Sequence, residues 1–254
     1  MSSSAPSRIV SLVPSQTDLL YHLGLADQVV GITKFCIHPD EWFRNKTRVG
    51  GTKTVDIGKV RALKPDLIIA NKEENVKEQV EQLQQVAPVY VSDINTLDEA
   101  LQMITTIGEL THTSSKAGNL SSQIENSFAE LSSLVGQPST PINTAYLIWK
   151  DPYMAAGGDT FIHDMMKRSG LNNVFANITR YPEVSIAQLS SANCQLLLLS
   201  SEPYPFKEKH IAELQEQLPQ IKILLADGEM FSWYGSRMLQ APAYFGKLIA
   251  QVRG

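Results

Sequence analysis

"DIGKVRALKPDLIIANKEE", residues 56–74, has a counterpart further along the chain. The stretch "SIAQLSSANCQLLLLSSEP", residues 185–203, repeats its pattern of apolar and polar residues at a constant offset of 129 positions. Because the match extends over a helix-like half and a strand-like half, the sequence indicates an internal duplication of one α/β unit. The equivalent positions are Ile57 and Ile186, Val60 and Leu189, Leu67–Ile69 and Leu196–Leu198, and Glu73 and Glu202.

Short apolar runs alternate with helix-like stretches along most of the chain. The helix-like stretches include Asn75–Gln85 and Phe206–Gln217. Alternation of this kind is typical of α/β units with parallel sheets, in which ligands bind at the carboxyl ends of the strands. The post-strand loops of two duplicated lobes are therefore expected to face a ligand cleft between the lobes. The candidate strands are Arg8–Leu12, Gln28–Thr33, Asp66–Ala70, Val89–Val91, Asn143–Trp149, Gln195–Ser200 and Lys222–Ala226.

The middle of the chain interrupts this alternation. Between Thr96 and about Leu134 there is no proline and no strand signal. Thr96 and Glu99 form a T-x-x-E capping box, and apolar residues then recur at helical spacing, which predicts one long backbone helix of about 55–60 Å. "THTSSKAG", residues 111–118, is its weak point, and "GQPSTP", residues 136–141, has the composition of a linker. The predicted organisation is an N-terminal lobe (residues 1–95), a linking backbone helix (96–137) and a C-terminal lobe (138–254).

The composition is that of an ordinary globular protein. The chain has 254 residues, of which 43% are hydrophobic and 19% charged, and its formal net charge is −4. Since there is no basic run, nothing indicates a nucleic-acid surface. The apolar runs are far shorter than the roughly 20 residues of a membrane span. Two cysteines in a chain of this length do not indicate a disulfide scaffold.

Aromatic residues gather just after the predicted strands. Each of them alone is best explained as closing a hydrophobic core. As a set they favour a binding surface, because tryptophan and tyrosine offer large apolar faces with a polar handle to a bulky ligand. The candidate ligand-binding aromatic residues are Phe35, Trp42, Trp149, Tyr153, Phe206, Phe231, Trp233 and Tyr234.

"KFCIHP", residues 34–39, places a thiol two positions from an imidazole. Cys36 and His38 supply at most two ligands, whereas a closed zinc site needs four, so no resident metal is expected. The favoured interpretation is that both side chains line the binding wall. A second interpretation stays open, in which His38 is an axial ligand to a metal carried inside the bound molecule.

"GGDT", residues 157–160, lies at a predicted helix start. It could hold an anion on backbone N–H groups, or Asp159 could simply cap the helix. The chain contains no nucleophile elbow, no H-E-x-x-H and no dinucleotide fingerprint, so an enzymatic function has no catalytic residues to support it.

Three N-terminal motifs carry a family resemblance: S-L-x-P-S-x-T, G-L-x-D-x-V-V-G and L-K-P-D-L-I. Together with the long helix and the related second lobe, they resemble the periplasmic substrate-binding proteins for cobalamin, haem and ferric siderophores, most closely the cobalamin branch. The resemblance implies two Rossmann-like lobes, a helical backbone, and a metal chelate as transported ligand with no intrinsic cofactor. It also implies a monomer in the periplasm that docks on a membrane ABC permease through acidic residues.

Several expectations follow from this resemblance. Asn71 joins the ligand-binding candidates. The docking candidates are Glu73, Glu74, Glu78 and Glu202, although Lys77 and Ser232 stand where the family pattern places its acids. Glu73 and Glu202, which the duplication makes equivalent, could instead hold polar groups of the ligand or be solvated surface charges. The alternatives are a haem or ferric-siderophore receptor, and a cytosolic corrinoid-binding protein or enzyme on the same frame. "MSSSAPSRIVSL" at the N-terminus has neither a secretory signal nor a lipid-attachment cysteine, which leaves the compartment open.

Overall fold

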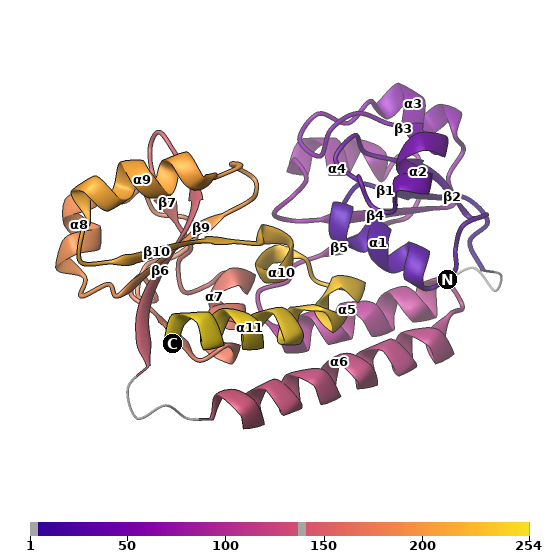
Figure 1. Cartoon of the computed structure of the whole chain (residues 1–254). Helices are drawn as coiled ribbons and strands as arrows, with labels where there is room; N and C mark the ends of the chain where they lie inside the picture. The colour runs from indigo at the N-terminus through magenta and orange to yellow at the C-terminus, as the bar shows by residue number, and fades with distance from the viewer. Residues whose placement is uncertain (1–4, 137–140, 254) are drawn as a thin grey trace. The chain divides into compact units, whose positions relative to one another are not determined.

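The computed structural model describes residues 5–136 and 141–253, and these divide into two compact units. Unit 1 comprises Met1–Ile94, Asp98–Gln123 and Tyr234–Arg237, and unit 2 comprises Asn95–Leu97, Ile124–Trp233 and Met238–Gly254. Each unit has its own sheet (Figure 1). The expected linker falls largely on residues 137–140, outside the described residues.

Unit 1 contains a parallel five-stranded sheet of order β3-β2-β1-β4-β5. Crossover helices connect its strands, as parallel pairing requires. The strands are β1 (Ile9–Ser11), β2 (Val29–Ile32), β3 (Thr47–Arg48), β4 (Leu67–Asn71) and β5 (Val89–Ser92), and the helices are α1 (Pro14–His22), α2 (Asp40–Asn45), α3 (Ile57–Ala62) and α4 (Lys77–Leu83).

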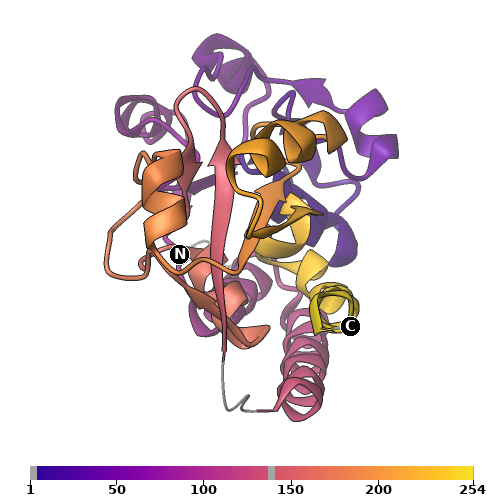
Figure 2. The same cartoon turned by 60° about the vertical axis from the view of Figure 1, so that its left-hand side comes forward.

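Unit 2 contains a sheet of order β10-β9-β6-β7, with β8 also paired to β6. β6, the longest strand, runs through the middle of this sheet (Figure 2). All its pairings are parallel except the antiparallel pair of β6 and β7. The strands are β6 (Ile142–Trp149), β7 (Met154–Ala155), β8 (Leu171–Asn173), β9 (Leu196–Ser200) and β10 (Lys222–Ala226), and the helices are α7 (Phe161–Arg168), α8 (Ile186–Ser191), α9 (Glu208–Gln217), α10 (Gly228–Ser232), η1 (Ser236–Leu239) and α11 (Ala241–Arg253).

The structure confirms the duplication element by element. α3 and α8 begin and end at positions 129 apart, and so do β4 and β9. The N-cap side chains are equivalent as well, since Asp56 accepts a hydrogen bond from the N–H of Lys59 and Ser185 accepts one from Gln188. The first strand of each unit is an inner strand of its sheet. β1 lies between β2 and β4, and β6 lies between β7 and β9.

The second sheet is buried on both faces, since helices cover the side chains that point to either side. Leu197 and Leu199 of β9 belong to the core cluster that includes Leu189 of α8 and Leu214 of α9. On β6, the ring of Tyr146 packs against Phe231 of α10 with ring centroids 4.8 Å apart. Alternate side chains of a strand point to opposite faces, and crossover helices cover both faces of a parallel sheet, so β9 is a continuous run of buried residues.

The linking helix expected over residues 96–137 is broken, as the weak point in its sequence allowed. The chain forms α5 (Leu97–Leu110) and α6 (Ser114–Val135), and the break lies within the stretch expected to be weak. His112 has a positive φ of 56°, and the N–H of Thr113 bonds back to the carbonyl of Gly108. A Cβ at Gly108 would lie 2.4 Å from the Cβ of Ala117, so glycine permits the close approach of the two helices. α6 alone is about 33 Å long.

The strand predictions are confirmed to within one residue at each end. Three short strands, β3, β7 and β8, were not expected from the sequence. They have two, two and three residues, which is too short for an alternating pattern to show.

A short segment near the C-terminus belongs to unit 1. Within Tyr234–Arg237, the hydroxyl of Ser236 donates to the Asp18 carboxylate on α1 at 2.7 Å. Gly235 has a φ of +121°, and a Cβ there would lie 3.3 Å from Leu19, so this turn favours glycine. The segment connects α10 to η1 and α11, which lie in unit 2 apart from the first residues of η1.

We predict that the two equivalent caps contribute equally to their units. Asp56→Ala and Ser185→Ala should each lower the free energy of unfolding by about 1 kcal/mol, because each removes a bond to an orphan helix N–H. Asp56→Gly and Ser185→Gly are the matched controls and should cost only a few tenths of a kcal/mol. Urea unfolding followed by circular dichroism measures all four variants. Equal losses for alanine and glycine would contradict the capping role.

Candidate ligand-binding loops

In the loop after β2, side chains alternate between the interior and the surface. Phe35 and Ile37 are 51% and 47% exposed, whereas Cys36 between them is fully buried. The Cys36 sulfur lies 3.1 Å from the Thr17 hydroxyl and 3.2 Å from the Thr33 hydroxyl. Two large apolar side chains of this loop are therefore exposed beside Lys34, whose Nζ lies 5.0 Å from the centre of the Phe35 ring, and its thiol belongs to the interior. His38 is partly exposed at the end of the stretch.

The burial of Cys36 and Trp42 differs from the expectation that they line an open wall. Trp42 is 1% exposed and packs edge-on against Tyr21, with ring centroids 5.3 Å apart. Burial raises the pKa of the Cys36 thiol, and hydrogen bonds from Thr17 and Thr33 oppose this rise only in part. Neither side chain reaches a surface in the described structure, so both support the loop from inside.

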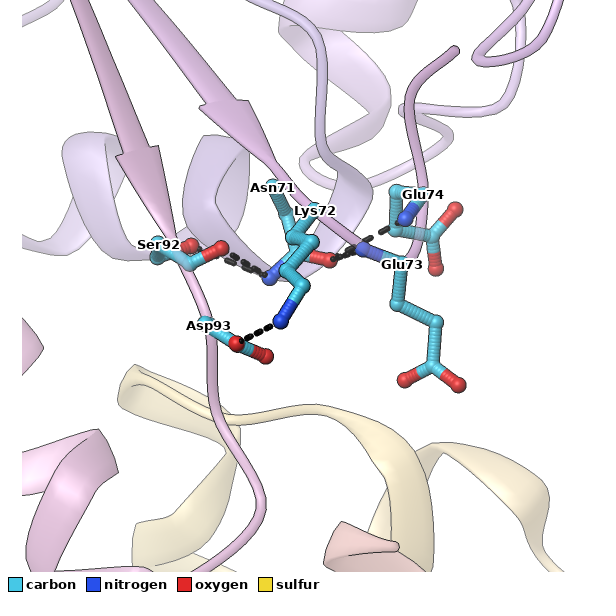
Figure 3. A network of polar contacts seen from close by, with 6 residues as sticks. All are labelled: Asn71, Lys72, Glu73, Glu74, Ser92 and Asp93. Atoms are coloured by element: carbon cyan, nitrogen blue, oxygen red, sulfur yellow. Dashed lines mark hydrogen bonds and ion pairs between the residues drawn. The ribbon is translucent and has the colours of Figure 1, made fainter. Parts of the chain in front are cut away.

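The loop after β4 is organised by the amide of Asn71 (Figure 3). The Asn71 Oδ1 atom accepts hydrogen bonds from the N–H groups of Glu73 at 2.8 Å and Glu74 at 3.0 Å. Its Nδ2 atom donates to the carbonyl oxygen and the hydroxyl of Ser92, at 3.0 and 3.1 Å. Asn71 is 2% exposed, so it holds this loop in place instead of presenting its own side chain.

The acidic residues of this loop lie on its outer side. The side chains of Glu73 and Glu74 point away from Asn71 (Figure 3). Both are partly exposed, and Glu78 in the first turn of α4 is exposed. Lys72 forms an ion pair with Asp93, which joins the ends of β4 and β5. The network thus fixes the backbone and leaves carboxylates at the surface.

In unit 2, aromatic rings gather beyond the end of β6. Trp149 is 40% exposed and stands edge-on to Tyr204, with ring centroids 5.8 Å apart. Tyr204 in turn contacts Phe206 at 4.8 Å and His210 at 5.5 Å. The N–H of Lys207 donates to His210 Nδ1 at 2.9 Å, which leaves the proton of a neutral ring on Nε2, toward the Tyr204 hydroxyl 3.4 Å away.

The members of this aromatic cluster differ in exposure. Phe206 is 4% exposed and belongs to the core, so it supports Tyr204 from below. Tyr153 is partly buried beside the same core, and burial raises the pKa of its hydroxyl. Trp149, Tyr153 and Tyr204 are therefore the aromatic residues that the β6 and β9 loops keep at least partly exposed.

Glu202, the counterpart of Glu73, has different surroundings. Its Oε1 atom accepts hydrogen bonds from the Ser232 hydroxyl at 2.7 Å and the Trp233 indole N–H at 2.8 Å. Burial raises the pKa of Glu202, and these two bonds oppose the rise. The carboxylate is thus directed at the end of α10.

The aromatic residues on and after α10 are also more buried than expected. Phe231 has no exposed surface and packs on Phe245 of α11, with ring centroids 4.7 Å apart. Trp233 and Tyr234 are each 6% exposed. Phe231 is therefore a core residue, while Trp233 and Tyr234 keep a small accessible edge.

The "GGDT" stretch does not offer free N–H groups. The N–H of Gly157 donates to the Arg180 carbonyl, and that of Gly158 donates to the Ile178 carbonyl, both at 2.8 Å. The expectation of an Asp159 cap is wrong, because Thr160 is the N-cap and accepts from the N–H of His163. Asp159 instead accepts from the N–H of Arg180.

The described residues contain neither a metal-binding cluster nor a helix that could span a membrane. Residues 5–136 and 141–253 contain no group of three or more histidine, cysteine, aspartate or glutamate side chains arranged to hold a metal ion. Within the same ranges, no helix combines the length and apolar character needed to cross a membrane.

The sequence analysis missed Ile37 as an exposed residue of the loop after β2. The signal that could have found it is the alternation of exposed and buried side chains on either side of Cys36.

The fold and these loops can now be compared with known proteins. A family model described as periplasmic binding protein matches residues 9–221. The chain belongs to this family. Its members are binding proteins and not a class of enzymes.

Two relatives and one solved structure are similar to this chain. The vitamin B12-binding protein of Vibrio parahaemolyticus is 26% identical over 204 residues, which are 79% of this chain and 73% of that protein. The uncharacterized ABC transporter substrate-binding lipoprotein YvrC of Bacillus subtilis is 28% identical over 188 residues, 71% of this chain but only 59% of YvrC. The solved structure of the haem-binding protein RhuT from Roseiflexus has a TM-score of 0.82 at 20% identity, covering 99% of this chain and 100% of RhuT.

These similarities bear on the fold and on the role of the protein. The likeness to RhuT confirms the two-lobed α/β fold with a long connecting helix. The relatives make this chain a binding protein of the ABC transporter type. The named ligands differ, being vitamin B12 in one relative and haem in the solved structure.

We predict that neither thiol reacts in the folded protein. Cys36 and Cys194 are both free and buried, and burial raises the pKa of each. Because the thiolate is the reactive form, a thiol reagent at pH 8 should label neither residue quickly in native protein and both in urea. Rapid labelling of native protein, traced by peptide mass spectrometry to Cys36, would contradict the inward orientation.

We also predict a pH dependence of stability that originates from Glu202. Burial raises its pKa above the usual 4.5, so the folded state holds this proton more tightly than the unfolded state does. Its contribution to the free energy of unfolding should therefore be complete below about pH 4.5 and decline as the pH rises through the folded-state pKa. Glu202→Gln should remove this decline, which urea titrations between pH 4 and 8 measure. Parallel curves for wild type and variant would contradict it.

Proposed function

We propose that this protein is the substrate-binding receptor of an ABC importer and that it binds a corrinoid. The observation that supports this most directly is the exposed apolar surface at the carboxyl ends of the strands, where α/β sheets bind ligands. The family match and the vitamin B12-binding relative support it independently. The receptor would act as a monomer in the periplasm, with no cofactor of its own.

In unit 1, the loop after β2 would contact the ligand. Phe35 and Ile37 are large apolar side chains that are about half exposed, which is unusual for two neighbours on one short loop. Cys36 and Trp42 anchor that loop from inside, and Asn71 fixes the loop after β4. The exposed pair would pack against the apolar face of a macrocycle, with His38 at its edge.

In unit 2, the rings after β6 and β9 would form the second contact. Trp149 rests edge-on against Tyr204, and Tyr204 is braced by Phe206 and His210. Rings held in this way lose little conformational entropy when a ligand binds. Tyr153 and Trp149 also carry polar groups that could bond to the amide periphery of a corrinoid. Trp233 would contribute its exposed edge, and so would Tyr234, which belongs to unit 1.

The second candidate function is that of a haem receptor. It is supported by the partly exposed imidazole of His38, a group that can ligate haem iron, and by the fold shared with RhuT. The corrinoid proposal is preferred because the loop after β4 displays Glu73 and Glu74, which would repel the carboxylates of haem but accept bonds from corrinoid amides.

Docking on the permease would use carboxylates of unit 1. Glu78 is exposed and Glu73 and Glu74 are partly exposed, so each can pair with arginine on a membrane partner. Glu202 has a different role, because its Oε1 atom already accepts two hydrogen bonds.

We predict one-to-one binding of cobalamin with sub-micromolar affinity. Purified protein should be incubated separately with cobalamin, haem and a ferric siderophore, and examined by absorbance, native mass spectrometry and calorimetry. Binding of cobalamin alone supports the proposal, and a shifted haem spectrum that disappears in His38→Ala supports the second candidate. No heat or spectral change with any of the three at tens of micromolar would contradict receptor function for these chelates.

We predict that the exposed pair on the β2 loop contributes to affinity without contributing much to stability. Phe35→Ala and Ile37→Ala should each weaken ligand binding about tenfold, since each removes apolar contact area worth about 1–2 kcal/mol, while the melting temperature changes little. Leu134→Ala is the control, because Leu134 is a 73% exposed apolar residue on α6. Wild-type affinity in both loop variants would show that the ligand does not contact this loop.

A further inference from the structure

We propose that Glu202 is a positioning residue, whose carboxylate fixes the Trp233 indole and the end of α10 in the orientation that binds ligand. The part that concerns ligand binding rests on the proposed function. The contact itself lies within unit 2 and stands independently of it.

The hydrogen bonds of Glu202 converge on one oxygen. Oε1 accepts from the Ser232 hydroxyl at 2.7 Å and from the Trp233 indole N–H at 2.8 Å. Both donors lie at the end of α10, on its last residue and on the residue that follows. The Ser232 hydroxyl is also 2.9 Å from the Gly228 carbonyl, one turn earlier. One carboxylate thus links the final helical residue and the ring that follows it.

The start of α10 is built to let Glu202 approach. A Cβ at Gly228 would lie 2.5 Å from the Glu202 Cγ and 2.7 Å from the Ser200 hydroxyl, so a larger residue would displace the glutamate. The N–H of Gly228 donates to the Ser201 hydroxyl at 2.9 Å. The Glu202 N–H is 3.3 Å from the Ser200 hydroxyl, which fixes its backbone to the end of β9.

Other contacts hold α10 at its start and middle. Asp227 caps the helix by accepting from the N–H of Glu229, and its own N–H donates to the Tyr244 hydroxyl. Phe231 is packed between Tyr146 and Phe245. These contacts place the helix axis, whereas the bond from Glu202 selects the orientation of the indole.

The equivalent position in unit 1 lacks this arrangement. The N–H of Glu73 also bonds to the side chain at the strand end, here Asn71, but the Glu73 side chain points away from that network (Figure 3). β5 is followed by residues leading to α5, with no helix corresponding to α10. Glu202 therefore has an equivalent position in unit 1, but its two hydrogen-bond donors lie at the end of α10, which unit 1 lacks after β5.

The test compares two substitutions of nearly equal size at position 202. Glu202→Gln keeps an oxygen acceptor and Glu202→Leu does not. The protein has three tryptophans, so its indole N–H signals are few, and Trp233→Phe assigns that of Trp233 in a ¹⁵N-correlated NMR spectrum. Hydrogen exchange of this indole N–H reports the contact without ligand. Glu216→Gln, an exposed glutamate on α9, is the control and should match wild type.

We expect Glu202→Leu to speed exchange of the Trp233 indole N–H at least tenfold and to weaken cobalamin binding about tenfold, as loss of a hydrogen bond to a charged group implies. Glu202→Gln should stay within about threefold of wild type in both measurements, and the difference in cobalamin affinity between glutamine and leucine should vanish in a Trp233→Phe background.

Three results would overturn the proposal. Unchanged indole exchange in Glu202→Leu would exclude the contact. Faster exchange with wild-type affinity would exclude a role in ligand binding. If wild-type protein binds neither cobalamin nor haem, the proposed function fails together with the ligand part of this inference, and indole exchange still decides whether Glu202 positions Trp233.

Discussion

A side chain at the end of a central strand, bonded to backbone N–H groups two or three residues later, is the constraint on which the loops after β4 and β9 depend. Asn71 does this after β4 and Ser200 after β9, at positions 129 apart. Because each bond closes a tight turn, the following residues leave the sheet in a fixed direction. Both units contain this type of hydrogen-bonded turn. It is followed by Glu73 in unit 1 and by Glu202 in unit 2, and the two carboxylates have different surroundings.

The candidate binding residues and their neighbours fall into two groups. Cys36, Trp42, Phe206 and Phe231 face the interior and hold their loops, whereas Phe35, Ile37 and Trp149 face outward. A bulky ligand needs large apolar surfaces that do not collapse in its absence, and buried neighbours provide that rigidity. The properties expected of a receptor thus come from the inward side chains as much as from the outward ones.

The sequence predicts the framework better than the site. The apolar runs of β4 and β9 and the constant offset between them suffice to find both units. The break between α5 and α6 was only suspected, because its cause is the approach of Gly108 and Ala117, a contact between helices that local pattern cannot show. Exposure of Trp149 and burial of Trp42 were equally invisible, since cores and ligand surfaces use the same residues at strand ends. Asp159 and Thr160 are both good caps, and only the bond to Arg180 decides between them.

The residues Tyr234–Arg237 have a consequence for how this chain can be divided. They belong to unit 1, while α10 before them and α11 after them belong to unit 2. No single cut in the gene therefore yields either unit whole. A fragment that ends before α7 lacks the turn that bonds to Asp18. A fragment that starts at β6 carries that turn without α1, the helix that holds Asp18. Each unit is therefore complete only when residues from before and after β6 are both present.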